Sequence, residues 1–126
     1  MYKRQDPGRF ELRLMDGSAN PYLLQASILA AGLDGLKNKI DPGNPLYCNM
    51  YEDFAKYPDL PKLPNELDQS LSQLKDNKSM NEAFGPDVIS SYVKLRNTEI
   101  KEFNSKESFD KAKAVTKWEK DNTLDC

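Results

Sequence analysis

The sequence has no histidine, a single tryptophan and only two cysteines in 126 residues. The chain therefore brings no imidazole of its own to a catalytic or metal site. Cys48 and Cys126 lie far apart, which matches neither the close spacing of a metal site nor a disulfide framework. Two free thiols in a reducing compartment are the favoured interpretation, with one disulfide between them as the alternative. We accordingly expect a cytoplasmic protein.

Charge imbalance is also missing, because 18 basic and 20 acidic residues leave a net charge of −2 at pH 7. Nothing in this balance indicates a nucleic acid or a membrane surface as partner. The first residues, Met1-Tyr2-Lys3-Arg4, lead into polar sequence, so no secretory signal is predicted. The chain shows no repeat and no low-complexity segment, and its length suits one small domain.

What the sequence does contain begins with an alternation of charged and apolar residues. Arg9, Glu11 and Arg13 alternate with Phe10, Leu12 and Leu14. In a strand the three charged side chains would share one face. Arginine forks suit phosphate or carboxylate, and a glutamate is a hard ligand for Mg²⁺ or Mn²⁺, so the face suits an anion with its metal. The alternative is an edge strand with a cross-linked, solvated polar face.

A helix is predicted directly after this strand. Asn20 is a good N-cap and Pro21 a good first residue. Residues 22–36 are almost entirely apolar, apart from Gln25 and Asp34, and such a helix is expected to be buried on all sides. It is too short and too rich in alanine and glycine for a convincing membrane span. With only 38% hydrophobic residues overall, the chain has little with which to cover it. We therefore expect the central helix of a larger core, ending at Asp41-Pro42-Gly43.

The remaining sequence predicts a loop followed by helices. Five prolines fall between residues 41 and 64 and leave little room for regular helix. Leucines at 67, 71 and 74 share one helical face, and Ser79 with Glu82 suggests a capping box that opens a short helical turn ending at 85–86. A longer helix is predicted from about residue 87. A last amphipathic helix is expected to start at Ser105 and to carry an apolar stripe: Phe109, Ala112, Val115 and Trp118.

These residues carry a resemblance to a known family. The run R-F-E-L-R-L-x-D-G-S-A-N-P-Y-L-L at 9–24, with I-L-A-A-G-L-D-G-L-K-N-K-I-D-P at 28–42, resembles the C-terminal part of the glutamine synthetase catalytic domain. The end of the chain, W-E-x-x-N-T-L-D-C at 118–126, resembles the terminus of a bacterial subgroup. Asn49-Met50-Tyr51 stands where many members carry an N-x-Y motif in a loop.

The resemblance implies an enzyme, a glutamate–ammonia ligase that uses ATP and Mg²⁺ or Mn²⁺ to form γ-glutamyl phosphate, which ammonia then attacks. By that resemblance Glu11 is a ligand of the metal, Arg13 is catalytic and holds phosphate and glutamate, and Arg9 lies near the ATP phosphates. The implied partners are glutamate, ammonia, ATP and a homo-oligomeric ring of synthetase subunits, with neither nucleic acid nor membrane. Such phosphoryl transfer depends on positioning and charge stabilisation, which arginines and metal ions supply.

Departures from the family pattern limit what the resemblance implies. The family uses further carboxylates, a metal-binding histidine and ammonia-side groups upstream of this region, and this chain has no histidine. Some bacterial members are adenylylated on the loop tyrosine. Tyr51 occupies that place, but Glu52-Asp53-Phe54 replaces the usual context. This altered context favours an ordinary surface tyrosine, with a modification site as the alternative.

The expected fold class is α+β: residues 1–126 form a mainly helical C-terminal portion of the catalytic domain, with an N-terminal strand from its antiparallel sheet, in a single incomplete domain. Two functions remain open at this point. The chain is either part of a glutamine synthetase and inactive alone, or a free-standing fragment that docks on full-length synthetase as a regulator or assembly partner. The intact R-F-E-L-R motif favours the first, since a docking module gains nothing from a metal ligand.

Overall fold

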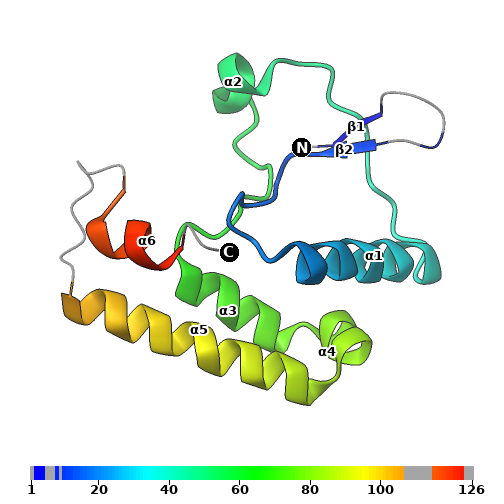
Figure 1. Cartoon of the computed structure of the whole chain (residues 1–126). Helices are drawn as coiled ribbons and strands as arrows, with labels where there is room; N and C mark the ends of the chain where they lie inside the picture. The colour runs from blue at the N-terminus through cyan, green and yellow to red at the C-terminus, as the bar shows by residue number, and fades with distance from the viewer. Residues whose placement is uncertain (1, 5–7, 9, 107–114, 124–126) are drawn as a thin grey trace.

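The computed structural model describes residues 2–4, 8, 10–106 and 115–123. The chain begins with two short strands, β1 (Tyr2–Arg4) and β2 (Phe10–Leu12), which pair antiparallel with Lys3 opposite Glu11. The strand predicted around residues 9–13 is thus confirmed over Phe10–Leu12, and β1 is an addition that the sequence did not predict. The two strands lie beside the first helix and away from the group of helices formed by residues 67–106 and 117–122 (Figure 1).

Helix α1 (Pro21–Lys37) follows as predicted. The Asn20 side chain accepts hydrogen bonds from the backbone N–H groups of Tyr22 and Leu23, and Pro21 occupies the first turn. The helix ends at Lys37, four residues before Asp41, because Asn38 caps it and Lys39 adopts a left-handed φ of 51°. The predicted stop at Asp41-Pro42-Gly43 therefore lies in the loop beyond the helix.

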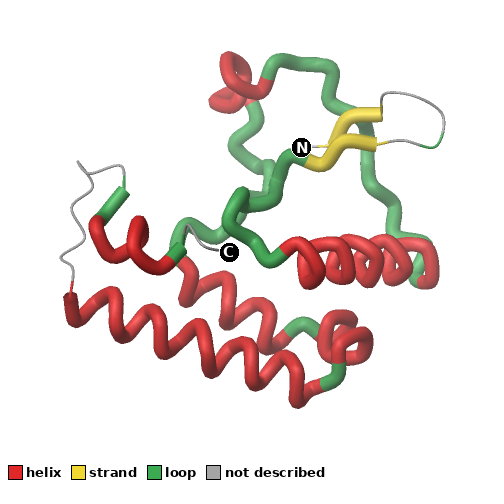
Figure 2. The backbone as a smooth tube through the Cα atoms, viewed as in Figure 1, coloured by secondary structure: helices red, strands yellow, loops and turns green. Residues whose placement is uncertain are grey.

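The loop that follows returns to the helices over a long, mostly irregular path (Figure 2). It contains only α2 (Met50–Asp53) and the short 3₁₀ helix η1 (Phe54–Lys56). The predicted scarcity of regular helix in the proline-rich region is confirmed.

The remaining helices form a compact group (Figure 1). Helices α3 (Leu67–Asp76) and α5 (Pro86–Lys106) pack against each other, and α4 (Lys78–Phe84) joins them and contacts α1. The core lies between α3 and α5, where Leu71 is 4% exposed and Ile89 5% exposed. Helix α6 (Lys117–Asn122) packs near the end of α5, with the rings of Phe103 and Trp118 edge to face at 5.6 Å.

Two predicted helix starts are wrong. Helix α4 is capped by Asn77, whose side chain accepts from the Met80 N–H, while the Ser79 hydroxyl bonds to Asp34 instead of capping its own helix. Ser105 does not open a helix, because α5 continues through it to Lys106. The last helix instead begins at Lys117 behind a Thr116–Glu119 capping box. Phe109 and Ala112 of the predicted stripe lie outside the described residues.

Helix α1 differs from the prediction in another way, since none of its residues is buried within this chain. Its outer face exposes Leu29 by 64%, Leu33 by 57% and Leu36 by 77%. Together with Phe10 of β2, this face borders an open apolar groove of about 540 Å³. Within the part of the chain that the structure describes, no helix is long and apolar enough to span a membrane.

Candidate functional site

The candidate site begins at the end of β2, where Glu11 and Arg13 form an ion pair. Alternation along the strand places both side chains on one side, and the Arg13 Nε–H donates to the Glu11 carboxylate. Both groups stay accessible, with side-chain exposures of 52% for Arg13 and 31% for Glu11. The structure thus brings together two of the three predicted charged residues. The third, Arg9, lies outside the described residues.

The electrostatics of the pair keep Arg13 charged. The hydrogen bond to Glu11, and then the negative charge of Glu11, raise the pKa of Arg13 above its ordinary value. Tyr51 adds a smaller contribution that also raises the pKa of Arg13. The predicted loop tyrosine thus affects the pKa of the predicted arginine, although 37 residues separate them in the sequence.

A metal ion needs more than Glu11 offers. Mg²⁺ keeps its waters unless several carboxylates or phosphates converge on it. Within the ranges that the structure describes, no three histidine, cysteine, aspartate or glutamate side chains cluster. The donor set of these residues therefore does not amount to a metal site, and Glu11 fits at most as one ligand of a site completed by other groups.

A short polar turn connects this ion pair to α1. The Asp16 carboxylate accepts from the Ser18 N–H at 2.8 Å and from the Ser18 hydroxyl at 2.7 Å. These bonds lower the pKa of Asp16, because donors directed at a carboxylate favour its charged form. The turn is followed directly by the Asn20 cap of α1, so it joins the strand that carries the ion pair to the apolar helix.

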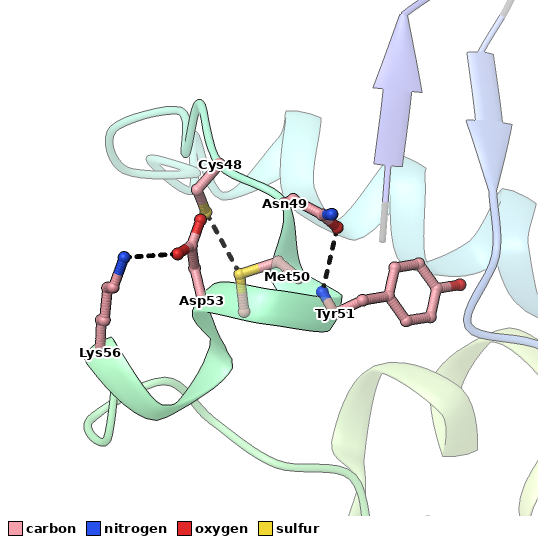
Figure 3. Close-up of polar contacts among 6 residues, drawn as sticks. All are labelled: Cys48, Asn49, Met50, Tyr51, Asp53 and Lys56. Carbon is pink, nitrogen blue, oxygen red and sulfur yellow. Dashed lines mark hydrogen bonds and ion pairs between the residues drawn. The ribbon is translucent and has the colours of Figure 1, made fainter.

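The loop that carries Tyr51 is organised by local contacts (Figure 3). Asn49 caps α2, and its side-chain oxygen accepts from the Tyr51 N–H at 3.2 Å. The Tyr51 side chain extends away from the Cys48–Met50 contact, in which the two sulfur atoms are 3.4 Å apart (Figure 3). On the far side of the loop, Lys56 pairs with Asp53 at 2.6 Å.

The geometry of the loop leaves the tyrosine hydroxyl open to solvent, since Tyr51 is 89% exposed. It also gives Asn49 a physical role, as the cap that orients the first turn of α2. This role was readable from the sequence, because asparagine before a short helix is a common cap. Cys48 is a free thiol, and its side chain raises the pKa of Tyr57 above its ordinary value.

Sequence reasoning missed one long-range contact altogether. The Ser79 hydroxyl of α4 donates to the Asp34 carboxylate of α1 at 2.7 Å. Asp34 was visible as a rare polar residue in an apolar helix, which was a usable signal for a specific partner. The identity of that partner was not predictable, because it lies 45 residues away in the sequence.

Comparison with known proteins places the chain in a family. The family model described as "Glutamine synthetase, catalytic domain" matches residues 1–121. The chain is 42% identical to a glutamine synthetase of Rhizobium meliloti (strain 1021) over 125 residues, which cover 99% of this chain and 27% of that protein. It is 38% identical over 103 residues to a glutamate–methylamine ligase of Methyloversatilis universalis, covering 79% of this chain and 23% of that protein.

A solved structure described as "GmaS/ADP complex-Conformation 1" shares the fold, with a TM-score of 0.72 and 36% identity. The match covers 94% of this chain and 25% of that one, so the chain spans about a quarter of the length of these relatives. The predicted family resemblance and fold class are confirmed. The chain belongs to the glutamine synthetase family of ligases, as a mainly helical C-terminal portion of its catalytic domain.

Proposed function

We propose that the chain works as part of a glutamine synthetase, which joins ammonia to the γ-carboxylate of glutamate through γ-glutamyl phosphate at the expense of ATP. The two relatives with 42% and 40% identity, both named glutamine synthetase, favour ammonia over methylamine as the acceptor. The exposed Glu11–Arg13 pair is the observation that carries the proposal. It presents a guanidinium and a carboxylate side by side at the end of a strand.

In this proposal each member of the pair has a separate task. Arg13 stabilises the negative charge that develops on the transferring phosphoryl group and holds the substrate carboxylate. Glu11 provides one ligand of a divalent metal, whose other ligands come from outside these residues. When bound, that metal would supply charge neutralisation for the ATP phosphates. Arg9 is assigned to the ATP phosphates. Tyr51 stands at the adenylylation position of some bacterial members, but its altered context favours an ordinary surface tyrosine over a modification site.

We further propose that residues 1–126 form a single incomplete domain that makes no glutamine alone. The exposed outer face of α1 supports this view, since apolar side chains such as Leu29 and Leu36 remain largely in water. The rest of a catalytic domain would cover them in a cytoplasmic, homo-oligomeric ring. The free-standing regulator is the competing function, because the same face would also suit docking on a complete synthetase.

The first experiment tests the activity directly. The purified chain is assayed for γ-glutamyl hydroxamate from glutamate, ATP, Mg²⁺ and hydroxylamine, beside its Glu11→Ala variant. We expect no product from either. Product from the unmodified chain that exceeds the variant would overturn the proposed inactivity.

The second experiment places the chain in a complete enzyme. Residues 1–126 replace the matching segment of the Rhizobium meliloti synthetase, and Arg13→Ala is expected to lower kcat about 10²–10³-fold through lost transition-state charge stabilisation. Lys56→Ala is the matched control, because it also removes an exposed ion pair, and kcat should not change. Equal kcat values for Arg13→Ala and the parent fusion would remove Arg13 from the site.

The third experiment separates enzyme part from regulator. Light scattering measures the mass of a complete synthetase ring with and without the added chain. An unchanged ring supports the proposal that the chain is an enzyme part. A ring that incorporates the chain or dissociates in its presence would favour the regulator instead.

A further inference from the structure

The apolar residues of helix α1 do not determine which side of the helix faces the rest of the chain. The positions of Leu23, Ser27 and Asp34 share one side of the helix, while those of Leu29, Leu33 and Leu36 fall on another. Both sides carry large apolar residues, so hydrophobic burial alone does not decide which side turns toward the rest of the chain. Some other interaction has to select the rotation of α1 about its axis.

The contacts between α1 and α4 supply that selection. The Asp34 Oδ1 atom accepts from the Ser79 hydroxyl at 2.7 Å and from the Asn38 amide at 2.8 Å. Asp34 and Ser79 are both half-buried, so turning α1 about its axis would break their hydrogen bond and leave water as the replacement partner of each group. Asn38 is the C-terminal cap of α1 itself, so the same carboxylate links the end of the helix to its neighbour.

Among the described residues, no side chain in the N-terminal half of α1 hydrogen-bonds to another helix. Near its N-terminus, Leu23 and Ser27 border an apolar groove of about 220 Å³ whose other wall includes Val88 and Tyr92 of α5. Apolar contacts of this kind tolerate rotation and repacking at small cost. A hydrogen bond to a carboxylate is stronger and more directional, and only one rotation of α1 allows it.

We propose that the Asp34–Ser79 hydrogen bond sets the rotational register of α1, turning the Leu23–Ser27 side inward and the Leu29–Leu36 side outward. A polar pair in an otherwise apolar interface that fixes one arrangement is an attested device in helical assemblies. The inference concerns the fold of this chain and does not depend on the proposed enzymatic function. Asp34 acts as a positioning residue in this role.

Thiol labelling measures the register directly. Cys48→Ser and Cys126→Ser remove the native thiols, and either Ser27→Cys or Leu33→Cys then reports on one side of α1. With Asp34 present, we expect the Leu33→Cys thiol to react faster. In the Asp34→Leu background we expect the ratio of the two rates to fall about tenfold toward one, the equilibrium equivalent of one charge-assisted hydrogen bond. Ser79→Ala should have the same effect.

Further substitutions at Asp34 and Ser79 distinguish a changed rotation of α1 from unfolding of the chain. Asp34→Asn keeps the accepting oxygen, so the rate ratio should survive. Ser79→Asp opposes two carboxylates and should collapse the ratio, and adding Asp34→Asn should restore it because the amide then donates to the new carboxylate. A ratio unchanged by both Asp34→Leu and Ser79→Ala overturns the proposal. So does a collapse shared equally by Asp34→Leu and Asp34→Asn with loss of the helical circular dichroism signal.

Discussion

Helix α1 and the α3–α5 pair differ in how their apolar content relates to burial. Helix α1 is apolar over nearly its whole surface, yet none of its residues is buried in this chain. Helices α3 and α5 carry many charged residues, yet they contain the core residues Leu71 and Ile89. Burial therefore depends on a complementary surface from a neighbouring element. For the α3 leucine stripe the chain contains that surface, and for the outer side of α1 its described part does not.

The largest expected effect is a loss of stability when the core between α3 and α5 is disrupted. Leu71→Ala should destabilise the chain by about 2–5 kcal/mol, because the Leu71 side chain is only 4% exposed in the core between α3 and α5. Leu95→Ala on α5 is the matched control, since Leu95 is 55% exposed and its loss should cost about 0.5 kcal/mol or less. Urea unfolding followed by circular dichroism gives both values. Equal costs at the two positions would mean that the α3–α5 core is not formed.

The next effect is a difference in the stability cost of one α1 substitution between the isolated chain and the fused synthetase. In the isolated chain, Leu29→Ala should cost about 0.5 kcal/mol or less, because the side chain is 64% exposed. In the fused synthetase it should cost about 2 kcal/mol or more, since the rest of the domain then covers the helix. Thermal unfolding of each protein with and without the substitution measures the difference. A small cost in both contexts would contradict the incomplete-domain proposal.

Sequence reasoning located the elements better than their surroundings. The start of α1 was predictable because Asn20 and Pro21 act through their own backbone neighbours. The start of α4 was missed because two residues competed as its cap, and Ser105 was mistaken for a helix start because α5 continues through it. Asn77 was preferred to Ser79, whose hydroxyl was taken by a distant carboxylate. Local chemistry is readable from sequence, whereas a competition decided by a tertiary contact is not.

The candidate site shows the same limit. Alternation along a strand was enough to predict that Glu11 and Arg13 share a side, and their ion pair agrees with it. The electrostatic effect of Tyr51 on the pKa of Arg13 depends on the path of a long loop, which no local pattern encodes. The assigned roles of all three residues stay predictions.

A smaller effect on stability is expected from removing the N-terminal caps of α6 and α1. Thr116→Ala should cost about 1 kcal/mol, because the Thr116 hydroxyl accepts from the Glu119 N–H and both halves of the capping box are present. Thr116→Ser keeps the hydroxyl and serves as the control. Asn20→Ala at α1 should cost a similar amount. Amide hydrogen exchange of α6 and α1 locates each loss, and a loss spread evenly over both helices would argue against local caps.

The smallest expected effect is a pH dependence that belongs to the turn before α1. The folded-state pKa of Asp16 lies below 3.8, its ordinary value, chiefly because the Ser18 hydroxyl donates to the carboxylate. A depressed carboxyl pKa stabilises the fold above the unfolded-state value, and that stabilisation disappears as the pH falls through the folded-state value. The window therefore lies below about pH 4, and the effect is small because Asp16 is exposed.

Ser18→Ala tests this assignment through the carboxyl carbon chemical shift of Asp16. Its titration midpoint should move only part of the way back toward 3.8, because the Ser18 backbone N–H still donates at 2.8 Å. Glu102 provides the internal control, since its pKa is lowered mainly by Lys106 and should not respond. Lys106→Met should reverse the pattern, moving Glu102 and leaving Asp16 unchanged. An Asp16 midpoint that is the same with and without the hydroxyl would show that the turn before α1 is not formed in solution. Its hydrogen bonds would then not fix the orientation of β2 relative to α1.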